Sequence, residues 1–218
     1  MATSNLPGLR FGQHRGLLAV LGLLAAAALY FLGHSALRYY VSFDVTTYGD
    51  FWPRHWGLVT HIAGGATAVG AGLVQLWLGL TGRIGALHRT LGRVYVSAII
   101  VGSAAAYYLA LTVKPPYVAY AAGLFMLSTA WVVTTAMAIA SIQRRALEQH
   151  REWMIRSYTV TFAFVTFRLV EQWLRAWHVA GDDGLAVDNL DIIMAWACWS
   201  VPLLLCEPLL QLRKIRRR

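Results

Sequence analysis

Long apolar runs constrain this chain more than any other feature of its sequence. Apolar side chains fill 58% of its 218 positions and charged ones only 13%, which is too apolar for a soluble domain of this size. A helix needs about 20 mostly apolar residues to cross the hydrocarbon core of a bilayer. Six stretches qualify, at roughly residues 17–40, 57–80, 94–113, 118–142, 157–177 and 190–212. We therefore predict an all-α integral membrane protein, a six-transmembrane-helix bundle that forms a single domain over residues 1–218.

Charged residues alternate between these stretches, and the alternation predicts the orientation in the membrane. One set of connections and ends is rich in arginine and includes the tail RKIRRR, whereas the other set carries most of the aspartates. Because Lys and Arg are retained on the cytoplasmic side, we expect both termini to be cytoplasmic, in a bacterial plasma (inner) membrane. This topology also accounts for the net charge of +9. No nucleic-acid partner is expected, since the arginines are spread over four segments instead of forming one stripe.

The motifs of soluble enzymes are absent from the sequence. It contains no phosphate-binding loop, no glycine-rich dinucleotide fingerprint and no nucleophile elbow. The two cysteines, Cys198 and Cys206, lie in the last apolar run without the spacing of a structural zinc site. We interpret them as small core residues. Any chemistry must therefore come from polar groups inside the apolar runs or at their ends.

Two stretches on the expected cytoplasmic side open with the same His-Arg pair, HRTLGR from His88 and HREWMIR from His150. They precede the third and fifth predicted spans, so both imidazoles are expected at the same depth. Imidazole is a common axial ligand of haem iron, and helical bundles hold cofactors between facing helices. Arg89, Arg93 and Arg156 would then lie near the haem propionates, because guanidinium groups suit carboxylates. The pattern predicts haem b at this face, although positive-inside anchoring or anionic lipid binding produces the same pairs.

Small residues line one face of the second predicted span. His61, Gly64, Ala68 and Gln75 recur at helical spacing, so a polar group lies near each end of a smooth strip. One interpretation is close helix packing, with the two polar side chains bonding across the interface. The other is that the strip leaves room for a flat ligand beside His61. Both interpretations stay open at this point.

The expected outer side carries three histidines near the ends of predicted spans: His34, His61 and His178. If a second, outer haem exists, His61 is its expected ligand, and His34 or His178 would have to oppose it. Alternatively, the three imidazoles form a small metal site, since imidazole suits copper, zinc or iron. A polar surface cluster without chemistry is the third interpretation.

Charged residues also interrupt the last two predicted spans. Arg168 lies about 12 residues, or roughly 18 Å, past the cytoplasmic start of the fifth span, near the middle of the membrane. An unpaired arginine is costly there, so we expect it to face the bundle interior and to pair with Glu171. Glu207 in the sixth span is a second acid below the membrane surface. We expect it to pair with Arg156 or Arg93, or to carry protons.

Several of these residues form a pattern that resembles a known family. His61, Gly64, Gln75 and Arg83, then HRTLGRVY, Trp131 and HREWMIRSYTVTFAFVTFRL, look like the bacterial and fungal membrane proteins grouped as domain of unknown function 2306. The resemblance covers about residues 55–175. It implies a small multi-span membrane protein and brings no established activity with it.

In helix order alone, the chain is also similar to the six-helix dihaem cytochromes of the b561 type. The inner haem of that family is held by a His from the third helix and a His from the fifth, and His88 and His150 match that placement. The outer pair, from the second and fourth helices, is only half matched by His61. This resemblance therefore implies one haem, and leaves the second haem without a complete ligand pair.

Two functions from different classes agree with these features. The first is a membrane electron-transfer protein in which the two His-Arg histidines hold haem b and exchange electrons with a quinone or another redox partner. The second is a non-redox membrane module, such as a small transporter, sensor or assembly protein, in which His61, Gln75, Arg168 and Glu171 line a polar intramembrane cavity. A membrane enzyme acting on a lipid or quinone is a third class, with the same polar groups as acids and bases. The sequence does not decide whether the protein forms a homo-oligomer.

Overall fold

The computed structural model of the chain describes residues 11–115, 117–177 and 189–215, and every regular element in these residues is helical. The longer helices are α1 (Phe11–Phe31), α4 (His55–Leu80), α5 (Ala86–Leu111), α6 (Val118–Gln143), α7 (Leu147–Thr161), α8 (Ala163–Ala176) and α9 (Asn189–Ile215). Short segments join α1 to α4, namely η1 (Leu32–Ala36), α2 (Arg38–Val41), α3 (Val45–Tyr48) and η2 (Gly49–Arg54). The predicted all-α class is confirmed for the described residues.

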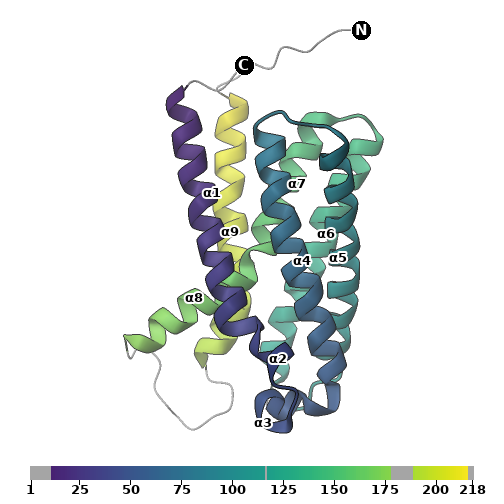
Figure 1. Cartoon of the computed structure of the whole chain (residues 1–218), viewed down its shortest axis with the longest axis vertical. Helices are drawn as coiled ribbons and strands as arrows, with labels where there is room; N and C mark the ends of the chain where they lie inside the picture. The colour runs from purple at the N-terminus through teal and green to yellow at the C-terminus, as the bar shows by residue number, and fades with distance from the viewer. Residues whose placement is uncertain (1–10, 116, 178–188, 216–218) are drawn as a thin grey trace.

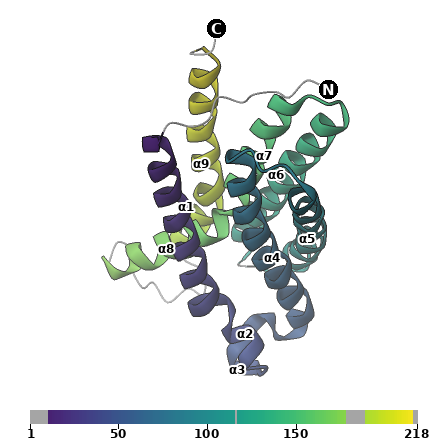
Figure 2. The same cartoon turned by 45° about the horizontal axis from the view of Figure 1, so that its top comes forward.

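Helices α4, α5, α6 and α7 form an up-and-down four-helix bundle (Figure 1). Each packs on the next, and α7 packs back on α4, so α5 and α7 lie on opposite corners. The centre of this bundle contains the largest fully buried side chains, among them Tyr95, Leu127 and Trp131. Helix α1 packs beside α4, and α9 packs beside α6 and α7 (Figure 2). The bundle is therefore the part of the fold that can enclose a site.

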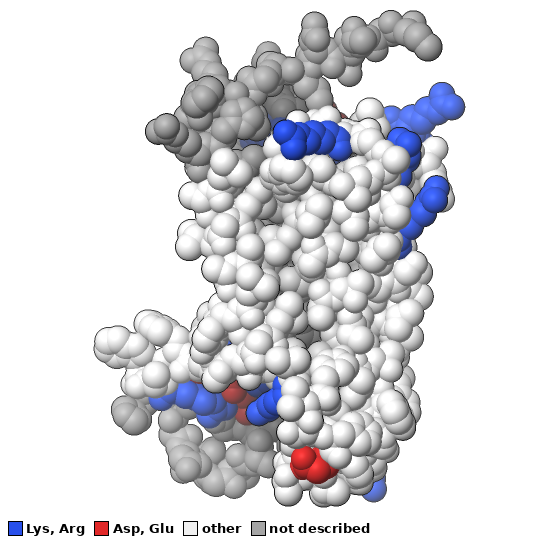
Figure 3. All heavy atoms as spheres, viewed as in Figure 1, with Lys and Arg blue, Asp and Glu red and all other residues white. Residues whose placement is uncertain are grey.

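Five segments of the described chain are long and apolar enough to cross a membrane. They are Leu18–Ala36, Val45–Leu80, Ala86–Leu111, Val118–Gln143 and Asn189–Ile215, and they coincide with five of the six predicted spans. On the face shown in Figure 3, uncharged side chains cover the middle of the molecule and charged side chains gather at its two ends. The predicted membrane protein with several transmembrane helices is confirmed.

The remaining predicted span, 157–177, is divided between two helices in the structure. Helix α7 ends at Thr161, and α8 turns out of the bundle to run past α1 and α9 (Figures 1 and 2). The charged residues Arg168, Glu171 and Arg175 follow the spacing i, i+3, i+7, so they occupy one face of α8. A helix of this strongly amphipathic kind suits the membrane surface better than the hydrocarbon core. The expectation of one continuous helix with Arg168 at its centre is thereby corrected.

The small-residue strip of α4 packs directly on its neighbours. A Cβ atom added at Gly64 would lie 2.7 Å from the Cα atom of Gly102 on α5. One added at Gly72 would overlap the ring of Tyr158 on α7 and would lie 3.0 Å from Cε2 of Tyr95. Real Cβ atoms do not approach other atoms so closely, because hard-sphere repulsion rises steeply there. Of the two interpretations of this strip, close helix packing is confirmed, and the strip leaves no room for a flat ligand.

Candidate site at the start of α5 and α7

The two predicted ligands lie at the same end of the bundle. Helices α5 and α7 begin at the same end (Figure 1), and His88 and His150 lie in their first turns. Because their helices stand on opposite corners of the bundle, a ligand held by both would lie across its end.

The two imidazoles differ in their hydrogen bonds. Nδ1 of His150 lies 2.8 Å from the carbonyl oxygen of Ala138 on α6. A carbonyl can only accept, so Nδ1 carries the proton and Nε2 keeps its lone pair. Nδ1 of His88 is buried and has no hydrogen-bond partner among the described residues. This end of the bundle therefore holds one imidazole oriented by the protein and another with a ring nitrogen that the protein leaves unsatisfied.

Helix α4 supports His88 from the side. The buried Gln75 amide donates through Nε2 to the main-chain carbonyl of His88. Cε1 of the His88 ring lies 3.8 Å from the place where a Cβ of Gly79 would be. Gln75 was expected to be a polar cavity residue, and the structure instead assigns it to fixing the first turn of α5 against α4.

The arginines of the two His-Arg stretches have different surroundings. Arg89 and Arg93 are exposed. Nη2 and Nε of Arg156 lie 2.5 and 3.0 Å from Oε2 of Glu207 on α9, so one of the two predicted pairings of Glu207 is confirmed. Arg156 is six positions past His150, or about 240° around the helix, and it therefore occupies another face of α7. Its guanidinium joins α7 to α9 and does not belong to the histidine site.

A buried hydroxyl network, which the sequence analysis did not identify, lies further along the same helices. Oη of Tyr95 is 2.8 Å from Oγ of Ser157 and 2.7 Å from Oγ1 of Thr161. Trp131 of α6 donates through Nε1 to Thr161 at 2.7 Å, and Oγ1 of Thr135 lies 2.8 Å from Ser157. All five side chains are buried. The network joins α5, α6 and α7. Its side chains fill the interior of the bundle next to the histidine site.

The sequence contains a spacing that agrees with part of this network. Tyr95 and Ser157 each lie seven residues past the histidine of their helix, and Thr161 follows Ser157 at i+4. These spacings place them on the same helix faces as His88 and His150. Single hydroxyl residues in membrane helices often bond back to their own helix, as Thr161 also does to Ser157. The pattern therefore carried no specific indication of a shared network.

The predicted outer histidines do not come together in the described residues. Nδ1 of His61 lies 3.0 Å from the Gly102 carbonyl, and its ring contacts Phe164 edge-on at 5.1 Å. His34 is exposed and stacks on Tyr30, while His178 lies outside the described residues. Among the residues that the structure places, no group of three His, Cys, Asp or Glu side chains could hold a metal ion. The alternative of a three-histidine metal site needs His178 and therefore stays a prediction.

The charged residues of α8 form ion pairs, as predicted for Arg168. Its Nη1 lies 2.8 Å from Oε2 of Glu171, a buried residue that also accepts from Nε of Arg175 at 3.2 Å. Nη2 of Arg175 lies 3.0 Å from Oδ1 of Asp191 on α9. The Arg168 side chain is nevertheless 42% exposed. The Arg175–Asp191 pair joins α8 to α9, whereas the other two pairs lie within α8.

The polar cavity of the alternative hypothesis is not formed by its four expected residues. His61 and Gln75 are fourteen positions apart on α4, which is about 21 Å along the helix. Each is bonded to a different carbonyl of α5, and Arg168 and Glu171 pair with each other on α8. His61 and Gln75 therefore join α4 to α5 at two separate places, and Arg168 and Glu171 form a pair within α8.

Comparison with known proteins gives a family and no further relative. The model of a family described as "Predicted membrane protein (DUF2306)" matches residues 58–210, which covers most of the chain and includes the histidine site and the hydroxyl network. This match confirms the resemblance found in the sequence. No curated protein and no solved structure matches the chain, so the likeness to b561-type cytochromes gains no support from these comparisons.

Proposed function

The chain belongs to the DUF2306 family of predicted membrane proteins, and from that premise we propose that it is a membrane electron-transfer protein that binds haem b between α5 and α7. The observation that carries the proposal is the pair formed by His88 and His150. They come from opposite corners of one four-helix bundle, at the same end, and each has a ring nitrogen left for a ligand. Two imidazoles from facing helices would be able to hold haem iron, because imidazole is a common ligand of haem.

The chemistry of the two imidazoles fits this cofactor. Histidines that bind metals usually donate their other ring N–H to a carbonyl or carboxylate, which fixes the tautomer and the ring orientation. The bond from Nδ1 of His150 to the Ala138 carbonyl is of this kind. The buried Nδ1 of His88 is a polar atom that the described residues leave without a partner, and such atoms call for an explanation in a folded protein. Bound haem would supply one-electron oxidation and reduction.

The surrounding residues limit where the cofactor lies and which arginines assist it. Tyr95 and the hydroxyl groups bonded to it fill the bundle two helical turns beyond the histidines. The space left for a cofactor held by the two histidines is therefore at the end of the bundle, where it would be accessible to a quinone or a protein redox partner. Arg89 and Arg93, exposed at that end, are the cations available to the propionates, since Arg156 is held by Glu207.

We also propose the orientation, with six crossings in a single transmembrane domain and both termini cytoplasmic. The five long apolar segments supply five crossings, and α7 supplies the sixth, with α8 turning onto the membrane surface at its end. The first residues of α1 and the last of α9 lie at the same end as the starts of α5 and α7 (Figure 1). Lys and Arg side chains gather at that end in Figure 3, whereas those at the other end lie near Asp and Glu, and an excess of Lys and Arg favours the cytoplasmic side. In this orientation the histidine site faces the cytoplasm of a bacterial cell.

The decisive experiment is the visible spectrum of the detergent-purified protein, oxidised and then reduced, with an iron assay on the same sample. We expect a Soret band in the wild type and its loss in both His88→Ala and His150→Ala. His34→Ala is the matched control, because that exposed imidazole lies elsewhere and should leave the band unchanged. Arg93→Ala should weaken haem retention without removing ligation.

A folded protein that stays colourless after expression with ample haem, and after addition of haemin to the purified sample, would overturn the proposal. Circular dichroism and a monodisperse elution profile establish that each variant is folded. A Soret band that survives both histidine substitutions would equally exclude this site. In either case the non-redox membrane module would become the better account of the chain.

A further inference from the structure

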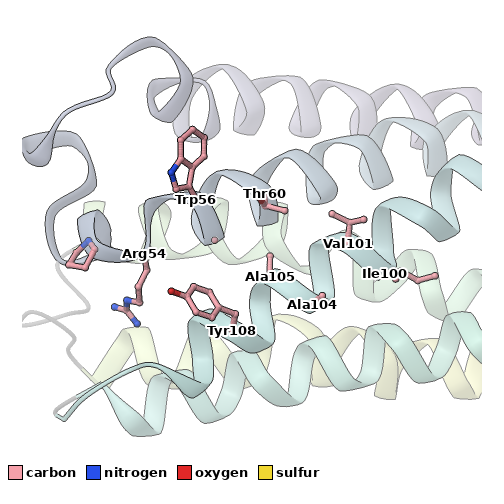
Figure 4. A pocket seen from close by; sticks show the side chains of 10 residues that line it. Arg54, Trp56, Thr60, Ile100, Val101, Ala104, Ala105 and Tyr108 are labelled. Carbon is pink, nitrogen blue, oxygen red and sulfur yellow. The ribbon is translucent and has the colours of Figure 1, made fainter.

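A lateral groove lies between the first turns of α4 and the last turns of α5, at the end of the bundle opposite to the histidine site (Figure 4). It has a volume of about 560 Å³. Most of its lining is apolar or aromatic, from Trp56, Ile100, Val101, Ala104, Ala105 and Tyr108. Arg54 lies at one end beside Tyr108, and the groove extends along α5 to Ile100 (Figure 4). The distance from Tyr108 to Ile100 along the helix is about 12 Å.

The guanidinium of Arg54 carries a charge that no described carboxylate neutralises. Its three hydrogen bonds are long and go to neutral oxygens, at 3.3 Å to the Leu109 carbonyl and 3.5 Å to Thr112 Oγ1 and to the Asp50 carbonyl. The ion pairs found in the described residues do not include it. The Asp50 carboxylate accepts instead from the Tyr117 hydroxyl at 2.8 Å. Since a guanidinium has five N–H donors, Arg54 can still bind an anion.

The level of Arg54 in the molecule indicates what kind of anion reaches it. Trp56 is 68% exposed and Tyr108 49% exposed on the outside of the bundle, and Trp and Tyr concentrate where a bilayer meets water. A groove that begins with a cation at this level and continues apolar toward the middle of the membrane matches a ligand with an anionic head and a hydrocarbon tail. Guanidinium groups recognise phosphate through paired N–H donors.

We propose that this groove binds an anionic phospholipid, with the phosphate at Arg54 and one acyl chain lying along α5 toward Ile100. The head is held by charge and the chain by burial of its methylene groups against the apolar lining. Free phosphate would satisfy the guanidinium but would leave the groove unfilled. The proposal is independent of the haem site, which lies at the other end of the bundle.

Native mass spectrometry of the full-length protein tests this site with phosphatidylglycerol and phosphatidylcholine added in equal amounts. We expect the wild type to retain phosphatidylglycerol in preference to phosphatidylcholine. Arg54→Gln should reduce that preference about tenfold, the equivalent of one charge-assisted contact, and Arg54→Lys should retain most of it. Ala104→Phe should block the groove and reduce retention of both lipids.

Two controls separate this site from general lipid adhesion. Lys114→Gln removes a cation at the same end of the molecule and should leave the preference unchanged. Ala136→Phe makes the same substitution as Ala104→Phe at an exposed position of α6 outside the groove and should also have no effect. Unchanged lipid preference in folded Arg54→Gln protein would overturn the proposal, as would displacement of phosphatidylglycerol by millimolar inorganic phosphate. If Ala104→Phe does not fold, the Arg54 variants decide alone.

Discussion

Helices α4 and α1 have similar apolar, small-residue-rich sequences and opposite surroundings. In α4 the small residues Gly64, Ala68 and Gly72 are buried against α5 and α7. In α1 a Cβ added at Gly22 would meet nothing within 4 Å, and Leu23 is 71% exposed. The comparison shows that apolar composition decides whether a segment enters the membrane, whereas the shape of its neighbours decides whether it faces protein or lipid.

The largest difference between the two helices should appear when one methyl group is added to a glycine of each. Gly64→Ala should lower the free energy of unfolding by about 1–3 kcal/mol, because the new Cβ meets the backbone of α5, which cannot turn aside as a flexible side chain does. Gly22→Ala should be neutral or slightly stabilising, since alanine favours a helix. Unfolding by a gradient of sodium dodecyl sulfate, followed by circular dichroism, measures both.

Gly65→Ala supplies a control within α4 itself. Gly65 neighbours Gly64 in sequence, but a Cβ there meets nothing within 4 Å. We expect its unfolding midpoint to match that of Gly22→Ala. Equal losses at Gly64 and Gly65 would mean that α4 and α5 are not in close contact in the membrane.

A smaller effect should come from removing single hydroxyl groups. Tyr95→Phe removes the group that bonds both Ser157 and Thr161 in the buried network, and we expect it to lower the free energy of unfolding by about 1 kcal/mol. Tyr30→Phe on α1 should cost almost nothing, because that tyrosine is 51% exposed and its 3.5 Å contact with Gln172 is long. The same detergent titration compares the two, and a Tyr30 effect equal to that of Tyr95 would contradict the distinction between bundle and flank.

The smallest effect should come from the ion pair that joins the bundle to α9. Arg156→Gln should cost less than about 1 kcal/mol, because the Glu207 side chain is 46% exposed and solvent screens the charges. Arg144→Gln is the matched control at an exposed position just after α6, where no change is expected. Raising the salt concentration should reduce the difference between wild type and Arg156→Gln, whereas a difference independent of salt would assign the role of Arg156 to packing on Trp153.

Much of the fold was predictable because apolar runs end at clear signals. The predicted spans 57–80 and 118–142 lie within a few residues of α4 and α6, and the turn after α4 contains Gly82 at a φ of 72°, in the left-handed region that favours glycine. The division of segment 157–177 into two helices was not predicted, because average hydropathy contains no information about the helix face on which the charges lie. The spacing of Arg168, Glu171 and Arg175 contained that information.

The candidate site was predictable in its residues but only partly in its contacts. Helix order was enough to place His88 and His150 at one end of the bundle. The different roles of Arg93 and Arg156 were not predictable, since they depend on which face of α7 meets α9, and that is a property of the packed bundle. For the same reason, the sequence around Tyr95 does not indicate its two partners, which both lie on α7.

The close approach of Gly64 to Gly102 also limits how the molecule can move. Besides that backbone contact, α4 and α5 are joined by His61 to the Gly102 carbonyl near one end and by Gln75 to the His88 carbonyl near the other. His61 and Gly64 meet the same residue, Gly102, so the two helices are held together at two levels and behave as one rigid body. Any opening that admits a ligand or a partner must therefore take place at the other helix contacts of the bundle, through a shift of α6 and α7 against this fixed pair.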